Sequence, residues 1–309
     1  MLNIEDMYLE MGIRREVYDF GSQIEGTLKE RFDAIDKTKE YGCQGVELVL
    51  DDKTPDGSTP MEYAKALYAH AKEQGLEVPI YTTGANFFVK EPEKELERLC
   101  RHIDIAAECK IPLLRHDVAW GYYEGYTGIK SYKKVIEAVA PFVRQAAEYA
   151  RERGVKTCSE NHGYLLQDSA RMLELFAAVD HPNYGFLCDM GNFTVVDEDC
   201  ATAVSALSDY IVHVHAKDML VRSGMNFDPG KGYNLSRGGN YWRGTIFGHG
   251  NVPTFQILSA IRKSGYDGYV SLEFEGMEPV LEGVEIGTQN LQHMIKVIGE
   301  GQRLSLIHI

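Results

Sequence analysis

Short apolar runs and helix-patterned stretches alternate eight times along this chain of 309 residues. The runs end at glycine or at clustered polar residues, as β-strands do, and the stretches between them carry apolar residues at helical spacing. The predicted strands cover residues 16–21, 45–50, 77–82, 111–117, 155–160, 185–189, 211–217 and 269–275. The predicted helices cover about residues 28–41, 61–74, 93–109, 132–153, 168–178, 198–207, 254–264 and 284–298.

Eight strand–helix units of roughly 30 to 40 residues match a (β/α)8 TIM barrel in number and in total length. The alternative is an open doubly wound sheet, but no Gly-x-Gly-x-x-Gly follows the first predicted strand. Because no linker or shift in composition marks a second domain, we predict an α/β protein with a single barrel domain over residues 1–303. The last six residues, 304–309, resemble a translated sequencing adapter, and we expect them to be a non-native tail.

Composition limits the kind of partner this chain has. Hydrophobic residues make up 44% and charged residues 25%, which is close to the globular average, so we expect a full core. The net charge of −14 argues against nucleic acid as a partner, since nucleic-acid-binding proteins usually carry a basic surface. No stretch approaches a membrane span and no secretory signal is visible. Six scattered cysteines without a Cys-x-x-Cys pair indicate a cytoplasmic protein.

Four consecutive predicted strands each place a side chain that can bind a metal at or near the carboxyl end of the strand. An acid at the end of a parallel strand is how α/β proteins build sites, although one such acid is as often a helix cap or a turn former. Alternation along a strand turns His213, His215 and Lys217 to one face, and Glu273 and Glu275 to one face. The candidates on the four strands are Glu160 and His162; Asp189; His213 and His215; and Glu273 and Glu275.

Inward charges at the rim of a barrel lose their hydration unless they are paired or bound to a metal. A set of three carboxylates and one imidazole is hard and rich in oxygen, which favours Mn²⁺ or Mg²⁺ and tolerates Co²⁺. Zinc is less favoured, although a catalytic zinc fits such a set. The sequence therefore predicts one divalent metal ion, with Mn²⁺ as the first choice.

Five segments of the second half resemble the xylose isomerase-like TIM-barrel superfamily. Within it they are similar to the sugar phosphate isomerase/epimerase group, which includes tagatose and psicose 3-epimerases, hydroxypyruvate isomerase and inosose-metabolising enzymes. The likeness covers nearly the whole chain and is specific for the superfamily rather than for a substrate. The segments are Ser-Glu-Asn-His (159–162), Cys-Asp-Met-Gly-Asn (188–192), His-Val-His-Ala-Lys-Asp (213–218), Gly-His-Gly-Asn-Val-Pro (248–253) and Ser-Leu-Glu-Phe-Glu (271–275).

The resemblance implies that Glu160, Asp189, His215 and Glu273 are the metal ligands, with His213 and Glu275 as the alternatives two residues away. It also implies an isomerase or epimerase of a small sugar or polyol ketone, acting by proton transfer through a metal-stabilised enediolate. Glu160 and Glu273 would be the two catalytic acids that exchange the proton. Loss of a β-hydroxyl from the same enolate would make the protein an inosose-type dehydratase.

Substrate contacts are expected from side chains near these strand ends and in the loops. Residues 219–250 form an unusually long predicted loop, either a lid over the substrate or a structured surface excursion. A structural role for His249 is as reasonable as a catalytic one, and Arg115 is a candidate to pair only with Asp117. The expected contacts are Arg115, His116, His162, Lys217, Arg243 and His249.

Two other functions fit the same barrel less well. An endonuclease IV-like DNA-repair nuclease needs a multi-metal cluster with more histidines, whereas this acidic chain has Asn192 three residues after Asp189. The ketose 3-epimerases often have a histidine at that position, so Asn192 also argues against that subgroup. A non-catalytic sugar binder would not need the full ligand set with its paired glutamates. Relatives are often homo-oligomers, and nothing in the sequence decides that for this chain.

Overall fold

The computed structural model describes the backbone of residues 28–307 and the side chains of residues 32–299. The predicted strand over residues 16–21 lies outside this part. The described chain falls into two compact units. We call residues 28–188 with 210–213 the N-terminal unit, and residues 189–209 with 214–307 the C-terminal unit. Among the described residues, no helix is both long and apolar enough to cross a lipid bilayer. The prediction of one domain over residues 1–303 stays a prediction.

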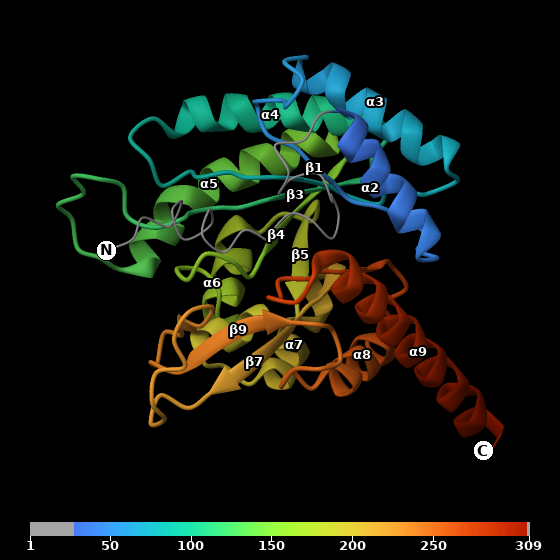
Figure 1. Cartoon of the computed structure of the whole chain (residues 1–309). Helices are drawn as coiled ribbons and strands as arrows, with labels where there is room; N and C mark the ends of the chain where they lie inside the picture. The colour runs from blue at the N-terminus through green and yellow to red at the C-terminus, as the bar shows by residue number, and fades with distance from the viewer. Residues whose placement is uncertain (1–27, 308–309) are drawn as a thin grey trace. The chain divides into compact units, whose positions relative to one another are not determined.

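The N-terminal unit alternates helix and strand along the chain, and the alternation can be followed in Figure 1. Its strands run in the order β1 to β6, and the pairings from β1 to β5 are all parallel. Parallel order with an intervening helix confirms the predicted α/β class. Its elements are α2 (Leu28–Glu40), β1 (Leu48–Val49), α3 (Pro60–Glu73), β2 (Tyr81–Thr83), α4 (Pro92–Glu108), β3 (Leu113–His116), α5 (Tyr132–Arg151), β4 (Lys156–Glu160), α6 (Ser169–Val179) and β5 (Tyr184–Asp189), whose last residue opens the C-terminal unit.

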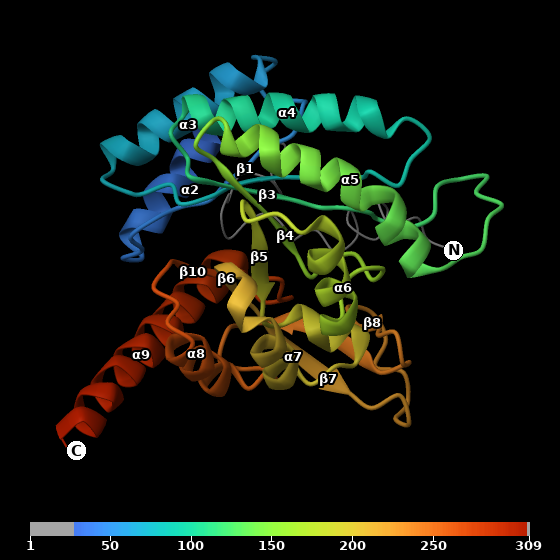
Figure 2. The ribbon, with the colours of Figure 1, turned by 180° about the vertical axis from the view of Figure 1, so that it is seen from behind.

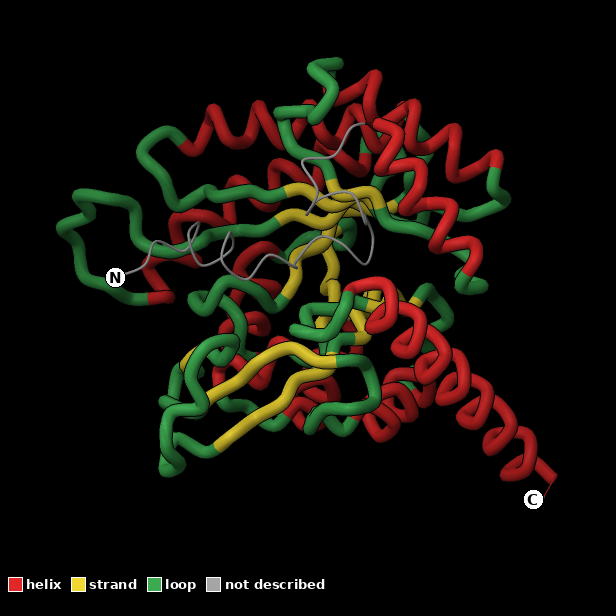
Figure 3. The backbone as a smooth tube through the Cα atoms, viewed as in Figure 1, coloured by secondary structure: helices red, strands yellow, loops and turns green. Residues whose placement is uncertain are grey.

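The C-terminal unit contains the end of β6, which pairs in parallel with β10, and the long helix α9, seen from behind in Figure 2. It also holds an antiparallel sheet in the order β7-β9-β8 (Figure 3). The predicted loop over residues 219–250 is therefore structured. The elements are η1 (Asn192–Val196), α7 (Cys200–Leu207), η2 (Ser208–Tyr210), β6 (Ile211–Ala216), β7 (Asp218–Arg222), β8 (Asn234–Leu235), β9 (Tyr241–Thr245), α8 (Thr254–Lys263), β10 (Val270–Leu272) and α9 (Val280–Ile307).

Polar side chains begin several helices where the sequence predicts them to start. Thr59 and Glu62 form a capping box at α3, in which each side chain accepts the other's backbone N–H. The Asp168 side chain accepts the Arg171 N–H in the first turn of α6, and the Asp199 side chain accepts the Thr202 N–H in the first turn of α7. Each cap supplies an acceptor for an N–H group that has no partner within its helix, and so stabilises the start of that helix.

Neighbouring strands of the N-terminal unit bury a shared apolar cluster. Its fully or almost fully buried members are Leu113 of β3, Cys158 of β4 and Leu187 of β5, with Ile80 just before β2. Val212 of β6 packs against them. Because each strand contributes one side chain, the cluster fixes the strands in register beneath their carboxyl ends.

Gly185 in β5 leaves no room for a side chain. A Cβ atom there would lie 2.5 Å from Cγ1 of Val212. We expect Gly185→Ala to lower the free energy of unfolding by about 1–3 kcal/mol through overpacking. Val212→Ala opens the space, so the double variant should be less destabilised than the two single costs added together. Urea unfolding of the four proteins measures this, and simple additivity would contradict the close contact.

His116 of β3 is a core residue. Its side chain is fully buried, its ring lies edge-on to Phe87 and against Tyr184, and its Nδ1 lies 2.8 Å from the Asp117 carbonyl oxygen. Burial lowers the pKa of His116 to about 4, although the carbonyl opposes the shift. The ring is therefore neutral in the folded protein at neutral pH, and it supports the strand from the core.

This buried histidine should make stability depend on pH. Because its folded pKa is depressed below the unfolded value, the unfolded chain alone binds the proton between about pH 6.5 and 4. Stability is full above this window and should fall through it by about 1.4 kcal/mol per pH unit from this group. Between about pH 6.5 and 4, the free energy of unfolding measured with urea should depend less steeply on pH in His116→Gln than in the wild type, by the slope that corresponds to about one proton. His293→Gln, at an exposed position of α9, should follow the wild type. Parallel curves for His116→Gln and the wild type would contradict the assignment.

Candidate metal centre

Asp189 is the last residue of β5 and is fully buried. Its Oδ1 accepts the backbone N–H groups of Gly191 at 2.8 Å and Asn192 at 3.0 Å. The chain turns here into η1, and a Cβ on Gly191 would lie 2.9 Å from the Lys217 carbonyl oxygen, so only glycine fits. The turn therefore fixes the orientation of the Asp189 carboxylate through one of its oxygens.

His215 and Glu273 meet at the paired ends of β6 and β10. His215 lies opposite Ser271 in the ladder, and the Glu273 N–H donates to the Ala216 carbonyl at 3.0 Å. His215 Nδ1 is 3.1 Å from Glu273 Oε2. Burial alone would raise the pKa of Glu273, but the Lys217 ammonium and His215 hold it well below its ordinary value. Glu273 is therefore an ionised carboxylate, the form in which it can bind a metal.

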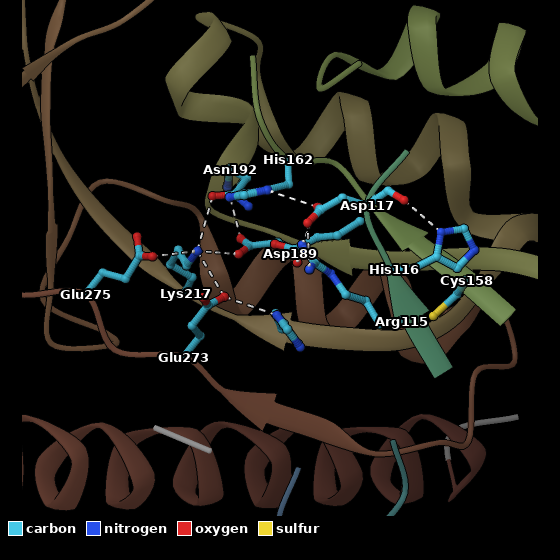
Figure 4. A network of polar contacts seen from close by, with 12 residues as sticks. Arg115, His116, Asp117, Cys158, His162, Asp189, Asn192, Lys217, Glu273 and Glu275 are labelled. Atoms are coloured by element: carbon cyan, nitrogen blue, oxygen red, sulfur yellow. Dashed lines mark hydrogen bonds and ion pairs between the residues drawn. The ribbon is translucent and has the colours of Figure 1, made fainter. Parts of the chain in front are cut away.

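The ammonium of Lys217 lies among three carboxylates, as Figure 4 shows. Its Nζ is 2.8 Å from Asp189 Oδ2, 2.9 Å from Glu273 Oε2 and 3.5 Å from Glu275 Oε1. It also donates to Asn192 Oδ1 at 3.2 Å. Three carboxylates and one ammonium leave this buried cluster with two formal negative charges.

Asp189, His215 and Glu273 fit a divalent metal ion. Each offers one ligand atom, and these atoms lie within 4.8 Å of one another. Two carboxylate oxygens and an imidazole nitrogen are donors that Mn²⁺ and Mg²⁺ accept. The two formal negative charges of the cluster are opposite in sign and equal in magnitude to the charge of such an ion. Glu160, the fourth predicted ligand, belongs to the N-terminal unit, and its ligand role stays a prediction.

The alternatives two residues away have other contacts. His213 belongs to the N-terminal unit, where its Nε2 pairs with a carboxylate oxygen of Glu47 and both side chains are buried. Glu275 is the most distant of the three acids around Lys217. Of His213 and His215, and of Glu273 and Glu275, it is His215 and Glu273 that lie next to each other in the C-terminal unit.

A second charged cluster lies in the N-terminal unit at the ends of β3 and β4. Arg115 donates to Asp117 at 2.8 and 3.2 Å and pairs with Glu160 Oε2 at 2.9 Å. His162 Nδ1 is 3.2 Å from Asp117 Oδ1. Burial opposes it, but Arg115 and His162 hold the pKa of Asp117 well below its ordinary value. The cluster thus orients Glu160 through a guanidinium group.

A small cavity of about 10 Å³ adjoins this cluster. Within the cluster, the His162 side chain is partly exposed. Asp117, Glu160 and His162 line it on the polar side, and Leu166 and Met172 on the apolar side. Arg115, Glu160 and His162 therefore lie together within one unit. His116, the fourth residue predicted near this strand end, lies in the core instead.

Arg243 and His249 have separate surroundings in the C-terminal unit. Arg243 of β9 is 3.4 Å from Glu278 and lies over the Tyr233 ring. His249 is exposed at a turn. That turn is held by Asp218, a buried residue that the sequence analysis did not single out. The roles of Arg243 and His249 in substrate binding stay predictions.

Asp218 is a buried anchor for the Gly-His-Gly turn. Its two oxygens accept four backbone N–H groups at 2.8–3.2 Å, from Met219, Gly248, Gly250 and Val252. Burial still raises its pKa, because desolvation outweighs these bonds. The sequence signal was an acid directly after a strand together with a distant Gly-x-Gly turn. Asp218 thus joins β7 to the segment that precedes α8.

Comparisons with known proteins place this architecture. The chain matches two inosose dehydratases from Lacticaseibacillus casei, each at 29% identity over 141 residues, 45% of this chain. The chain thus spans about half the length of these curated relatives. Among solved structures it is similar in fold to an L-ribulose 3-epimerase (TM-score 0.69, 14% identity, 90% of this chain and 92% of that one).

It is also similar in fold to a xylose isomerase-like TIM barrel protein from Mycobacterium smegmatis in complex with magnesium (TM-score 0.64, 16% identity, 88% and 89% of the two chains). A family model described as xylose isomerase-like TIM barrel matches residues 35–297. That match covers most of the chain and confirms the predicted superfamily. The chain belongs to the xylose isomerase-like TIM barrel family.

Proposed function

We propose that this protein is a divalent-metal-dependent isomerase or epimerase that acts on the ketone form of a small sugar or polyol. The observation that carries the proposal is the buried group of Asp189, His215 and Glu273 in a member of this family. The names of the relatives, inosose dehydratase and L-ribulose 3-epimerase, support a small polyhydroxylated substrate. The magnesium-bound relative supports a divalent ion.

In this proposal Asp189, His215 and Glu273 hold the ion, and Glu160 is the fourth ligand that the sequence predicts. A bound divalent ion would polarise the substrate carbonyl and stabilise the negative charge that develops on its oxygen. Lys217 forms ion pairs with both Asp189 and Glu273. The Asp189 carboxylate cannot rotate freely, because two backbone N–H groups hold its other oxygen.

Proton transfer is assigned to the two glutamates. One removes the proton from the carbon next to the carbonyl, and the other returns a proton. Return to the opposite face of the same carbon gives an epimer, and return to the neighbouring carbon gives an aldose–ketose isomer. Arg115 fixes the Glu160 carboxylate by an ion pair at 2.9 Å, which limits the directions from which Glu160 can reach a substrate.

Dehydration is the second candidate. It is favoured by the relatives named inosose dehydratase. The first step is the same proton removal next to the carbonyl, after which the β-hydroxyl leaves as water. The product is then an unsaturated ketone, which absorbs in the ultraviolet, whereas an epimer or isomer does not gain such a band.

A screen of ketoses, inososes and hydroxypyruvate with Mn²⁺ in D₂O tests the proposal by NMR. We expect solvent deuterium at the carbon next to the carbonyl of the substrate that is converted. Glu273→Gln and Glu160→Gln should each lower turnover by about 10²–10⁴-fold, because glutamine cannot carry the proton. Glu282→Gln, an exposed position on α9, is the matched control and should keep full activity.

Two results would overturn this mechanism. The first is conversion with hydrogen transferred wholly within the substrate, which indicates a hydride shift. The second is turnover near the wild-type rate in both glutamine variants, which would move the proton carriers to His162, Lys217 or Glu275.

A further inference from the structure

The side chain of Lys217 is 2% exposed and ends among the acids of the C-terminal unit. It forms ion pairs at 2.8 Å with Asp189 and at 2.9 Å with Glu273. These are the two carboxylates that the proposed function assigns to a metal ion. Figure 4 shows the ammonium at the centre of these contacts.

Asp189 has one oxygen facing a cation. Its Oδ1 accepts two backbone N–H groups, and its Oδ2 faces the Lys217 ammonium. On Glu273, the same oxygen, Oε2, faces both Lys217 and His215. An ion bound through these oxygens would bring two cations to the same atoms, where they repel each other.

From these contacts we propose that the Lys217 ammonium competes with the divalent ion for Asp189 and Glu273, so that this lysine sets how tightly the ion is held. The inference rests on the proposed function, since it concerns the same ligands. Lysine suits such a role because its charge sits on a flexible stem of four carbons and needs no fixed geometry.

Two further acceptors give the ammonium a place to move. Glu275 Oε1 lies at 3.5 Å and Asn192 Oδ1 at 3.2 Å from Nζ. Asn192 is not a predicted ligand, and Glu275 is predicted only as the alternative to Glu273. A shift of the ammonium toward these oxygens keeps it paired while Asp189 and Glu273 bind the ion. Asn192 thereby gains a function that the family resemblance does not assign to it, and Glu275 gains one different from its alternative role as a ligand.

The formal charge of the cluster around Lys217 determines whether removal of the ammonium strengthens or weakens metal binding. With Lys217 present the cluster has two formal negative charges, and without it the cluster has three. Removing the ammonium should therefore tighten binding of a divalent cation and destabilise the protein in the presence of a chelator. A lysine that served only to contact substrate would leave metal affinity unchanged.

The test is calorimetric titration of Mn²⁺ into wild type and Lys217→Met after treatment with EDTA. Methionine has a similar length and no charge. We expect Kd for Mn²⁺ to fall by at least about tenfold in Lys217→Met, with a larger rise in Tm on addition of Mn²⁺ than in wild type. Asp189→Asn, which removes a ligand, should weaken Mn²⁺ binding in the same titration. An unchanged or higher Kd in Lys217→Met would overturn the inference.

A second measurement uses the wild-type protein, so it does not depend on the folding of Lys217→Met. The ¹⁵N-ammonium signals of the lysines are followed by NMR during titration with Mg²⁺, and Lys217→Arg identifies the signal of Lys217. That signal should shift and saturate with the same Kd as Mg²⁺ binding, and a signal unchanged at saturation would contradict competition. If wild type binds neither ion, the proposed function fails as well. If it binds both and the signal or Kd does not respond, only this inference fails.

Discussion

The pairing of a buried ammonium with buried carboxylates governs this structure at its strand ends. Lys217 lies within 3.5 Å of Asp189, Glu273 and Glu275, all in the interior of the C-terminal unit. Buried acids without a counter-charge would take up protons or would not stay buried. Two of these acids, Asp189 and Glu273, are also the ones that the proposed function assigns to a metal ion.

In the N-terminal unit, a guanidinium group balances the charge of the buried carboxylates. Arg115 pairs with Asp117 through two hydrogen bonds and with Glu160 through an ion pair. A planar guanidinium fixes both carboxylates in direction, whereas an ammonium only balances charge. Glu160 is thus held in direction by a guanidinium group, whereas Asp189 and Glu273 share the Lys217 ammonium as their cation.

The parallel strands could be predicted from the sequence because they are short apolar runs that end at glycine or polar residues. The helices between them could be predicted because their apolar residues recur at helical spacing. The family could be predicted because its motifs lie at strand ends, where alternation decides which side chains share a face. That rule also bears on His116: neighbours on a strand point to opposite faces, so His116 lies in the core while Arg115 faces Glu160.

Other features depend on contacts between distant segments. The pairing of Arg115 with Glu160 follows from the β3–β4 register, which sets Arg115 beside Cys158 and which the sequence does not specify. Most of the antiparallel sheet of β7, β8 and β9 lies in the stretch predicted as a long loop, either a lid or a structured excursion. Its strands were not predicted, because they are short and the segments between them are rich in glycine. The role of Asp218 depends on a turn 30 residues away.

The central claim is that Asp189, His215 and Glu273 hold a divalent ion. Anomalous diffraction from crystals soaked in Mn²⁺ measures this most directly, because the manganese signal locates the ion without assumptions about its ligands. We expect one strong peak about 2.0–2.3 Å from an oxygen of Asp189, an oxygen of Glu273 and a ring nitrogen of His215. A crystal saturated with Mn²⁺ that shows no peak there, or a peak at Glu47 and His213 instead, would contradict it.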